Sequence, residues 1–400
     1  MSKSEVSPFT PGQPAPVELF TGRASQVESL SDLARAAAQG KFKVAFLTGE
    51  RGIGKSSIAA FVRRLAEQRL HLLTLQVFLG GSSNETEAVR RILDRLAKSG
   101  VGASWFEKIK SLFGNQIEEV GLFGVQVGFA PDSAKLQKLT DGFDIALRTL
   151  VRRLEGERDG LFIVLDDING LASSESFAHW LKSLVDGIAT SGEPLPLFLL
   201  LVGLEDRRRE LLSAQPSLAR VFELVAIDPW DDDEASAFLK KAFDSVGISI
   251  EDRALEVLTR YTGGLPVLAH EIGDAAYRFD DDSVIDSDDA YQAVLAAADV
   301  VGRKHVEPHV MEAIRSKRYR TILKKIPAKG LGREFKRSDL LDHLETEEVK
   351  VADNFLRKMR DLSVLEQMPS EGAGWYRFTS ELHFLYFLVE SIRSQLTQSE

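Results

Sequence analysis

Between residues 20 and 227 the hydrophobic residues form short runs that are separated by longer amphipathic stretches. Runs with little alternation are typical of strands that a parallel sheet buries on both faces, and a 3.6-residue period predicts helices. The pattern therefore predicts an α/β core built on a parallel five-stranded sheet. The predicted strands are Val44–Thr48, Leu72–Val77, Leu161–Leu165, Leu197–Val202 and Leu224–Ile227, and the clearest helices between them are Ile58–Gln68 and Phe177–Ile188.

Residues 100–139 interrupt this rhythm. The spacing of the apolar residues from Trp105 to Phe113 predicts a short helix. Val125, Val127 and Phe129 alternate with other residues, which is the period of a strand. We expect an insertion that carries a helix and a β-hairpin. It would serve either as a cover on the core or as a surface for self-assembly or for a partner.

The remainder of the chain divides into two further regions. After Trp230 the pattern is helical only, and from about Arg318 three helices precede two apolar runs on either side of a glycine-containing turn, which is the order of a winged helix. We expect a Pro-rich lead-in (1–17), the core (18–230), a helical lid (231–300) and a linker helix with a winged helix (301–400). The predicted elements are Asp231–Phe243, Asp252–Tyr261, Leu265–Phe279, Asp286–Ala298, Tyr319–Ile326, Ser338–Leu344, Val349–Leu362, Val364–Met368, Tyr376–Thr379 and Glu381–Leu396.

Composition limits the class of protein. Among 400 residues, 44% are hydrophobic and 28% charged, which excludes a disordered or fibrous chain and predicts two or three domains. No apolar run approaches the ~18–20 residues of a membrane span, and the N-terminus lacks a secretory signal. The absence of cysteine excludes disulfides and thiolate sites. We therefore expect a cytoplasmic protein without a membrane partner.

The strongest motif is the segment Gly49–Ser56, which fits G-x-x-x-x-G-K-[ST] in full between a predicted strand and a predicted helix. Glycines let backbone N–H groups curl around phosphate oxygens, and the helix start adds a partial positive charge. The segment predicts an ATP site. Its contacts would come from Gly49, Gly52, Ile53, Gly54, Lys55, Ser56 and Ser57, with Lys55 at the β- and γ-phosphates and the Ser56 hydroxyl on Mg²⁺.

Two acids, Asp166 and Asp167, directly follow the apolar run Leu161–Leu165. A P-loop site needs a carboxylate at the end of a neighbouring strand. Asp166 is the candidate Mg²⁺ ligand, and Asp167 is the candidate catalytic residue that polarises the attacking water.

With both motifs placed, the chain resembles P-loop ATPases of the AAA+/STAND group with a C-terminal winged helix. Phe20-Thr21-Gly22-Arg23 resembles the F-x-G-R segment that opens these domains, which implies that Gly22 and Arg23 contact the adenine side. The segment before the last predicted strand contains Arg220, where this group places an arginine finger for a neighbouring subunit. Arg207, Arg208 and Arg209 are weaker alternatives.

The resemblance departs from the group's pattern at two places. The run Leu197–Gly203 resembles the sensor-1 strand of this group. The group has Asn, Ser or Thr at the tip of that strand, whereas this chain has Gly203, Leu204 and Glu205 there. The segment from Gly263 to Pro266 resembles the G-x-P motif of STAND proteins, which implies that Pro266 contacts nucleotide when the lid closes. The first two turns of the helix that follows contain no arginine that could act as sensor 2, and this absence favours STAND proteins over initiator-type relatives.

The distribution of charge is compatible with two roles for the winged helix. The chain has a net charge of −10, yet residues 315–360 hold fourteen Lys and Arg against seven acids. This segregation favours double-stranded DNA binding through Lys350, Arg357 and Lys358, with Arg377 on the wing. The alternative is a winged helix that acts as an internal lever. We expect an ATP-hydrolysing switch whose nucleotide state controls homo-oligomerisation and a partner protein, with a DNA-handling ATPase as the alternative.

Overall fold

The structure is a computed structural model that describes residues 6–13, 19, 21–99, 117–119, 127–129, 133–362, 364–368, 371–379 and 381–398. The chain forms two compact units. The first is Gly22–Asp228, and the second combines Met1–Thr21 with Pro229–Glu400. Phe20 and the helix predicted from Trp105 to Phe113 lie outside the described residues.

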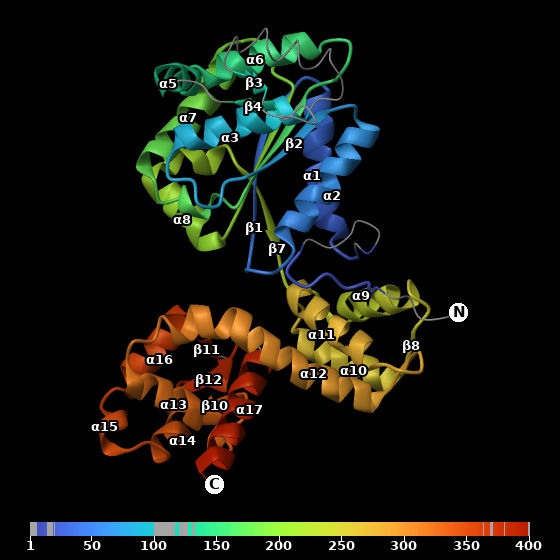
Figure 1. Ribbon diagram of the computed structural model, residues 1–400. Helices are drawn as coiled ribbons and strands as arrows, with labels where there is room; N and C mark the ends of the chain where they lie inside the picture. The colour runs from blue at the N-terminus through green and yellow to red at the C-terminus, as the bar shows by residue number, and fades with distance from the viewer. Residues whose placement is uncertain are drawn as a thin grey trace. The chain divides into compact units, whose positions relative to one another are not determined.

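The first unit is built on a five-stranded sheet in which all neighbouring strands are parallel (Figure 1). The strand order is β2-β5-β6-β1-β7. The strand β1, which precedes the Gly-rich loop, is therefore separated by β6 from β5, which leads to Asp166 and Asp167. All five predicted strands are confirmed. Their bounds are β1 Phe42–Gly49, β2 Leu73–Phe78, β5 Leu161–Asp166, β6 Leu197–Gly203 and β7 Glu223–Ile227.

Helices cover both faces of this sheet. α1 and α2 lie on one face, and α3, α6 and α7 lie on the other (Figure 1). This arrangement explains why β5 and β6 are buried at every position and read as unbroken apolar runs. The helices are α1 Ala24–Ala38, α2 Lys55–Arg69, α3 Glu85–Lys98, α5 Ser133–Asp141, α6 Phe143–Leu154, α7 Glu175–Thr190 and α8 Glu205–Ala214, with short 3₁₀ turns η3 Ile168–Gly170 and η4 Pro216–Arg220.

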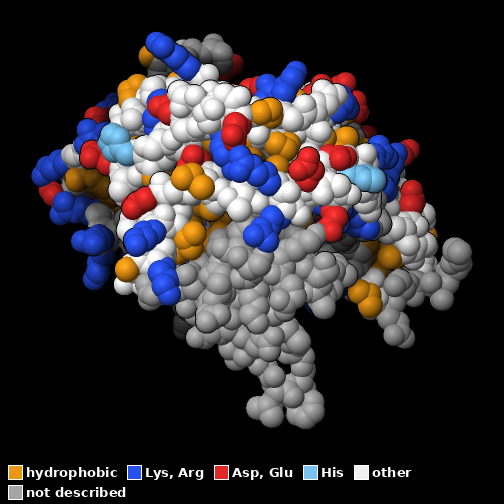
Figure 2. Space-filling model, turned by 90° about the horizontal axis from the view of Figure 1, so that it is seen from above, with side chains coloured by type: hydrophobic (Ala, Val, Ile, Leu, Met, Phe, Trp, Pro, Cys, Tyr) orange, Lys and Arg blue, Asp and Glu red, His pale blue; other side chains and the backbone are white. Residues whose placement is uncertain are grey.

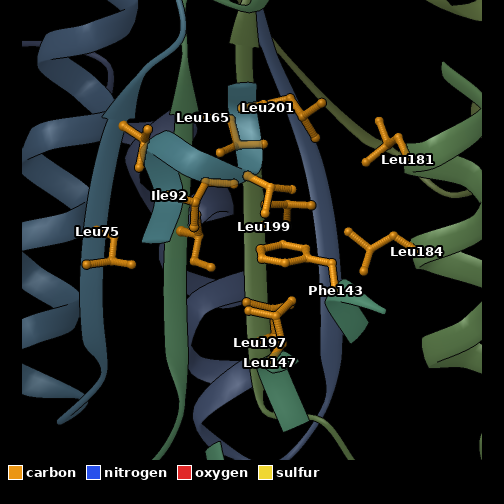
Figure 3. Packing of buried hydrophobic residues seen from close by; sticks show 14 of the residues in the cluster. Leu75, Ile92, Phe143, Leu147, Leu165, Leu181, Leu184, Leu197, Leu199 and Leu201 are labelled. Atoms are coloured by element: carbon orange, nitrogen blue, oxygen red, sulfur yellow. The ribbon is translucent and has the colours of Figure 1, made fainter. Parts of the chain in front are cut away.

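The main core fills the space between the sheet and α3, α6 and α7. Figure 3 shows Ile92 of α3 and Phe143 of α6 among leucines of β2, β5 and β6, with Leu181 of α7 at the right of the same cluster. Burying such a side chain contributes roughly 1.5–3 kcal/mol. This packing makes the ends of the strands rigid, and those ends carry the functional residues.

The insertion contains the predicted hairpin: β3 (Ile117–Glu119) and β4 (Val127–Phe129) pair antiparallel.

The second unit begins with four helices, α9 Asp232–Asp244, α10 Asp252–Thr262, α11 Pro266–Phe279 and α12 Ser287–Val301. The prediction that this region is purely helical was wrong in one detail. Ser249–Ile250 (β8) and Val284–Ile285 (β9) form a short parallel pair that ties the loops together. A π-helical segment, η5 Gly302–Met311, follows α12.

The C-terminal part has a three-stranded sheet in the order β10-β12-β11, which packs with helices around one core. The helix predicted at Val349–Leu362 was wrong in extent: it divides at Val351, whose N–H bonds to Glu348 O three residues earlier. The strand β10 was missed because it has only three residues. The elements are α13 Lys317–Ala328, β10 Glu334–Lys336, α14 Arg337–Asp342, α15 Thr346–Val349, α16 Ala352–Asp361, β11 Leu365–Gln367, β12 Trp375–Phe378 and α17 Glu381–Gln398.

Part of the N-terminal lead-in is anchored in the second unit. The ring of Phe9 is buried and makes edge contacts with Phe238 and Phe243. Gly273 of α11 leaves the space for it, because a Cβ there would overlap the Phe9 ring. The backbone N–H of Thr10 donates to His270 Nδ1 at 3.0 Å.

In the described part of the chain, no helix combines the length and the apolar character that crossing a bilayer requires. On the face seen in Figure 2, acidic, basic and hydrophobic side chains are interspersed among the described residues.

Candidate nucleotide-binding site

The loop after β1 has the backbone that a phosphate cradle requires. Gly52 and Gly54 have φ of 80° and 96°, a left-handed region that other residues rarely adopt. A Cβ at Gly49 would lie 2.9 Å from Ile227 O, so glycine is needed for the close approach to β7. Ile53 is buried and anchors the loop to the core.

α2 begins at Lys55, and its N-cap residue Gly54 provides no side-chain cap. The first N–H groups of a helix need external partners, so this end suits an anion. The Lys55 ammonium lies 2.9 Å from Gly49 O and 2.7 Å from Glu50 O. Burial lowers the pKa of Lys55 to about 8, although Asp166 and Asp167 oppose the shift. Ser56 and Ser57 occupy the first turn of the helix.

Asp166 ends β5 and is buried, with its two oxygens held by different elements. Ser56 Oγ donates to Oδ1 at 3.1 Å, and Gln76 Nε2 of β2 donates to Oδ2 at 2.8 Å. Burial raises the pKa of the Asp166 carboxyl, and these hydrogen bonds partly oppose that rise. Sequence reasoning missed Gln76, although it is the only residue with a polar amide in the strand Leu73–Phe78.

Asp167 lies beside Asp166 but points to a more open environment, and its side chain is exposed. Its φ of 57° and ψ of 54° are left-handed, a conformation that Asp tolerates better than most residues. Asn169 Nδ2 donates a hydrogen bond to Asp167 Oδ1. Gly80, in the loop after β2, is so close that a Cβ there would lie 2.5 Å from Asp167 Oδ2. Sequence reasoning did not identify Asn169 or Gly80.

Gly22 and Arg23 precede α1, and both have left-handed backbones. The Arg23 side chain is buried, and its Nη1 donates to the backbone carbonyl of Asp228, the last residue of the first unit. Arg23 therefore links the two ends of this unit. An adenine contact by Gly22 and Arg23 remains a prediction.

The candidate finger arginines differ in their surroundings. Arg208 and Arg209 pair with Glu205, whose pKa the Arg208 hydrogen bonds lower to about 2, and Arg207 pairs with Glu210. Arg220 is exposed at the end of η4, immediately before β7. It is the one of the four that makes no ion pair within the described residues.

Pro266 is the first residue of α11 and follows Gly263 and Gly264, whose φ values are 54° and 73°. A Cβ at Gly264 would overlap Trp230 O, so the glycine allows the close approach that the Trp230 N–H to Gly264 O bond of 2.9 Å requires. The role of Pro266 at a nucleotide remains a prediction.

Three of the four C-terminal residues predicted to contact DNA have nearby partners. Lys350 pairs with Glu347, and Arg377 with Glu366 at 2.5 Å. Arg357 donates to Asn354 Oδ1 at 2.7 Å, and Lys358 lies next to it on α16. Part of the basic surplus is therefore paired with acids of the same region.

The site residues fit the ATP and Mg²⁺ predicted for them. Hydroxyl and carboxylate oxygens are the ligands that Mg²⁺ prefers, and Ser56 and Asp166 supply one of each within 3.1 Å of each other. The glycine loop and the uncapped start of α2 supply the N–H groups for phosphates.

Comparisons with known proteins agree with this geometry. The family model described as "AAA ATPase domain" matches residues 19–202. The ORC2 protein of Aeropyrum pernix, in ADPNP–ADP complexes, is 15% identical with a TM-score of 0.57, and the match covers 97% of both chains. A Walker-type ATPase of Pyrococcus abyssi is 16% identical with a TM-score of 0.57, over 94% of this chain and 96% of that one. No curated protein sequence matches.

At these identities the solved structures show a shared fold, whereas the domain match supports nucleotide-dependent ATPase activity. The strand order, the Gly-rich loop and the paired acids are consistent with both. Together the domain match over residues 19–202 and the shared fold support an AAA+ ATPase.

Proposed function

We propose that this protein is an ATP-hydrolysing molecular switch whose centre is formed by Gly49–Ser56 and the two acids after β5. One observation carries the proposal: Ser56 Oγ lies 3.1 Å from Asp166 Oδ1, although the two residues are 110 positions apart. The groups that would share a magnesium ion are already adjacent. The ADPNP–ADP complexes of the ORC2 protein, which shares this fold, support nucleotide as the ligand.

In this proposal the loop residues bind and the acids direct the chemistry. The N–H groups at the start of α2 hold phosphate oxygens, and Lys55 leaves the carbonyls of Gly49 and Glu50 to offset charge on the β- and γ-phosphates. Asp167 orients the attacking water. When bound by Ser56 and Asp166, Mg²⁺ supplies positive charge next to the phosphates.

Arg220 gives the switch its link to assembly. Arg220 is exposed at the end of η4 and makes no ion pair in the described residues, which supports a role in which it contacts the phosphates of a neighbouring subunit. ATP therefore promotes homo-oligomers, and hydrolysis releases them and changes the helical lid (231–300), which contacts the nucleotide through Pro266. The same change is passed to a partner protein through the C-terminal part, which we interpret as a winged helix from its α13-β10-α14-α15-α16-β11-β12 order.

The ion pairs of the C-terminal part favour this lever role. Lys325 binds Glu345 and Glu348, and Arg337 binds Asp353 with two nitrogens. Paired charges contribute less to counterion release than free ones, so they support contact with protein rather than with phosphates.

DNA handling remains the second candidate because of α16. There Arg357 and Arg360 hydrogen-bond to the neutral amides of Asn354 and Gln367, which leave their positive charge in place. A helix with this charge suits a major groove.

The experiment for the first function measures ATP turnover and sedimentation together. Wild-type protein should hydrolyse ATP and sediment faster with a non-hydrolysable analogue, whereas Lys55→Ala should do neither. Turnover that persists in Lys55→Ala would place the site elsewhere. Equal sedimentation of wild-type protein with and without analogue would contradict the switch.

The experiment for the second function is a duplex-binding titration at several salt concentrations. If α16 binds DNA, Lys350/Arg357/Lys358→Ala should weaken binding and reduce the salt slope by about one unit per lost phosphate contact. Absence of binding at low salt would eliminate DNA handling and leave the partner protein.

A further inference from the structure

The end of β6 poses a question that the sequence leaves open. Related ATPases have a polar side chain there, whereas this chain has Gly203 and then Leu204. In the structure the space at Gly203 is not empty. A Cβ at this residue would lie 3.3 Å from Asn169 Oδ1, 3.3 Å from an Ile168 carbon and 3.2 Å from the Phe46 ring. The Asn169 amide oxygen therefore borders the space that a side chain of residue 203 would enter.

Asn169 belongs to η3, two residues after Asp167, and it makes two hydrogen bonds with different roles. Its Oδ1 accepts the backbone N–H of Leu204 at 2.9 Å. Its Nδ2 donates to Asp167 Oδ1. The N–H of Leu204 can only donate and an ionised carboxylate can only accept, so these partners determine the orientation of the amide.

We propose that Asn169 is the positioning residue for Asp167. Its amide, which belongs to η3 after the neighbouring strand β5, takes the place of the polar side chain that the end of β6 lacks. This inference rests on the proposed ATP hydrolysis. The amide joins the ends of β5 and β6 and holds one oxygen of Asp167, while Gly80 limits the space at the other oxygen. The carboxylate is thereby fixed in rotation although its side chain is exposed.

The consequence is a specific kinetic effect. Asn169 does not touch the phosphate cradle, whose described bonds come from Lys55 and Ser56, so its loss leaves ATP binding intact. Loss of the donor lets Asp167 rotate, and misplacement of a catalytic group by about 1 Å costs on the order of 100-fold in rate.

The first test compares Asn169→Ala and Asn169→Asp with the wild type. Asn169→Asp keeps the acceptor for Leu204 N–H but loses the donor to Asp167. Both variants should lower kcat about 10- to 100-fold with KM and the affinity for a fluorescent ATP analogue unchanged. A kcat for Asn169→Asp equal to that of the wild type would overturn the proposal, as would a loss of kcat that is matched by a loss of affinity or of the folded state.

A second pair of variants tests the other bond of the amide. Leu204 has φ −81° and precedes α8, so proline fits its backbone. Leu204→Pro removes the N–H that Asn169 accepts, whereas Leu204→Ala keeps it and serves as the matched control. Only Leu204→Pro should lower kcat. Equal kcat values for the two folded variants would contradict the anchoring role.

These results are separate from the proposed function itself. If the wild type binds the analogue but has no turnover under any condition, ATP hydrolysis fails first. If the wild type turns over and the Asn169 variants and Leu204→Pro have the same kcat as the wild type, hydrolysis stands and the positioning role of Asn169 fails.

Discussion

Ser56 Oγ and Asp166 Oδ1 lie 3.1 Å apart and join the first turn of α2 to the end of β5. Gln76 holds the other oxygen of the same carboxylate at 2.8 Å. A buried carboxylate is stable only when its oxygens have partners, so these bonds are part of the stability of the fold as well as of the site.

This arrangement predicts an energetic coupling between Gln76 and Asp166. Gln76→Met keeps the volume but removes the donor, and it should lower the free energy of unfolding by about 1–3 kcal/mol because the carboxylate loses a partner. In the background of Asp166→Leu the same change should cost much less. Urea unfolding of the four proteins measures the coupling, and additive effects would show that the bond contributes nothing.

The close approach of Gly80 to Asp167 predicts a loss of turnover from the smallest possible change. Gly80→Ala adds a Cβ that would lie 2.5 Å from Asp167 Oδ2, so the carboxylate must move. We expect kcat to fall about 10- to 100-fold with little change in ATP affinity. The control is Gly81→Asn, because Gly81 has φ 75°, which Asn tolerates, and a Cβ there meets no atom within 4 Å. Equal kcat in the two variants would refute the steric argument.

A finger that acts between subunits predicts complementation. Arg220→Ala and Asp167→Asn should each be inactive alone, because one lacks the finger and the other the catalytic acid. In a mixture of equal amounts, about one quarter of the sites would combine an intact Asp167 with an intact neighbouring Arg220. Turnover should recover to about that fraction. Arg209→Ala, which removes an exposed arginine paired with Glu205, should keep its turnover when it is assayed alone. A mixture that stays inactive would contradict action in trans.

The contact between the lead-in and α11 predicts a pH-dependent stability. Burial lowers the pKa of His270 to about 4, from an ordinary value of 6.5. Between these values the unfolded chain binds a proton that the folded protein does not, so stability is complete above pH 6.5 and is lost as the pH falls towards 4. From pH 7 to pH 5 His270 should cost about 2 kcal/mol. The variant His270→Gln keeps an acceptor for the Thr10 N–H.

Unfolding of the two proteins at both pH values isolates this effect, since all carboxylates are common to them. The loss of stability between pH 7 and pH 5 should be smaller in His270→Gln by about 2 kcal/mol. Identical pH dependence would mean that His270 is charged or accessible in the folded protein.

Local sequence determined the elements on which the site is built. The apolar runs identified all five strands, and the segment Gly49–Ser56 indicated the loop because its glycines and its lysine act through their own backbone and side chain. The pair Asp166–Asp167 was recognisable for the same reason, since it follows an unbroken apolar strand.

Only the tertiary structure decided which groups hold these acids. Gln76, Gly80 and Asn169 are each unremarkable in the sequence, and they meet the acids because parallel pairing aligns the ends of β2, β5 and β6 at one edge of the sheet. The paired state of the C-terminal arginines and lysines was equally hidden, because a count of charges contains no distances. Pattern and composition describe each segment by itself, whereas hydrogen bonds and ion pairs depend on the register between segments that are distant in the chain.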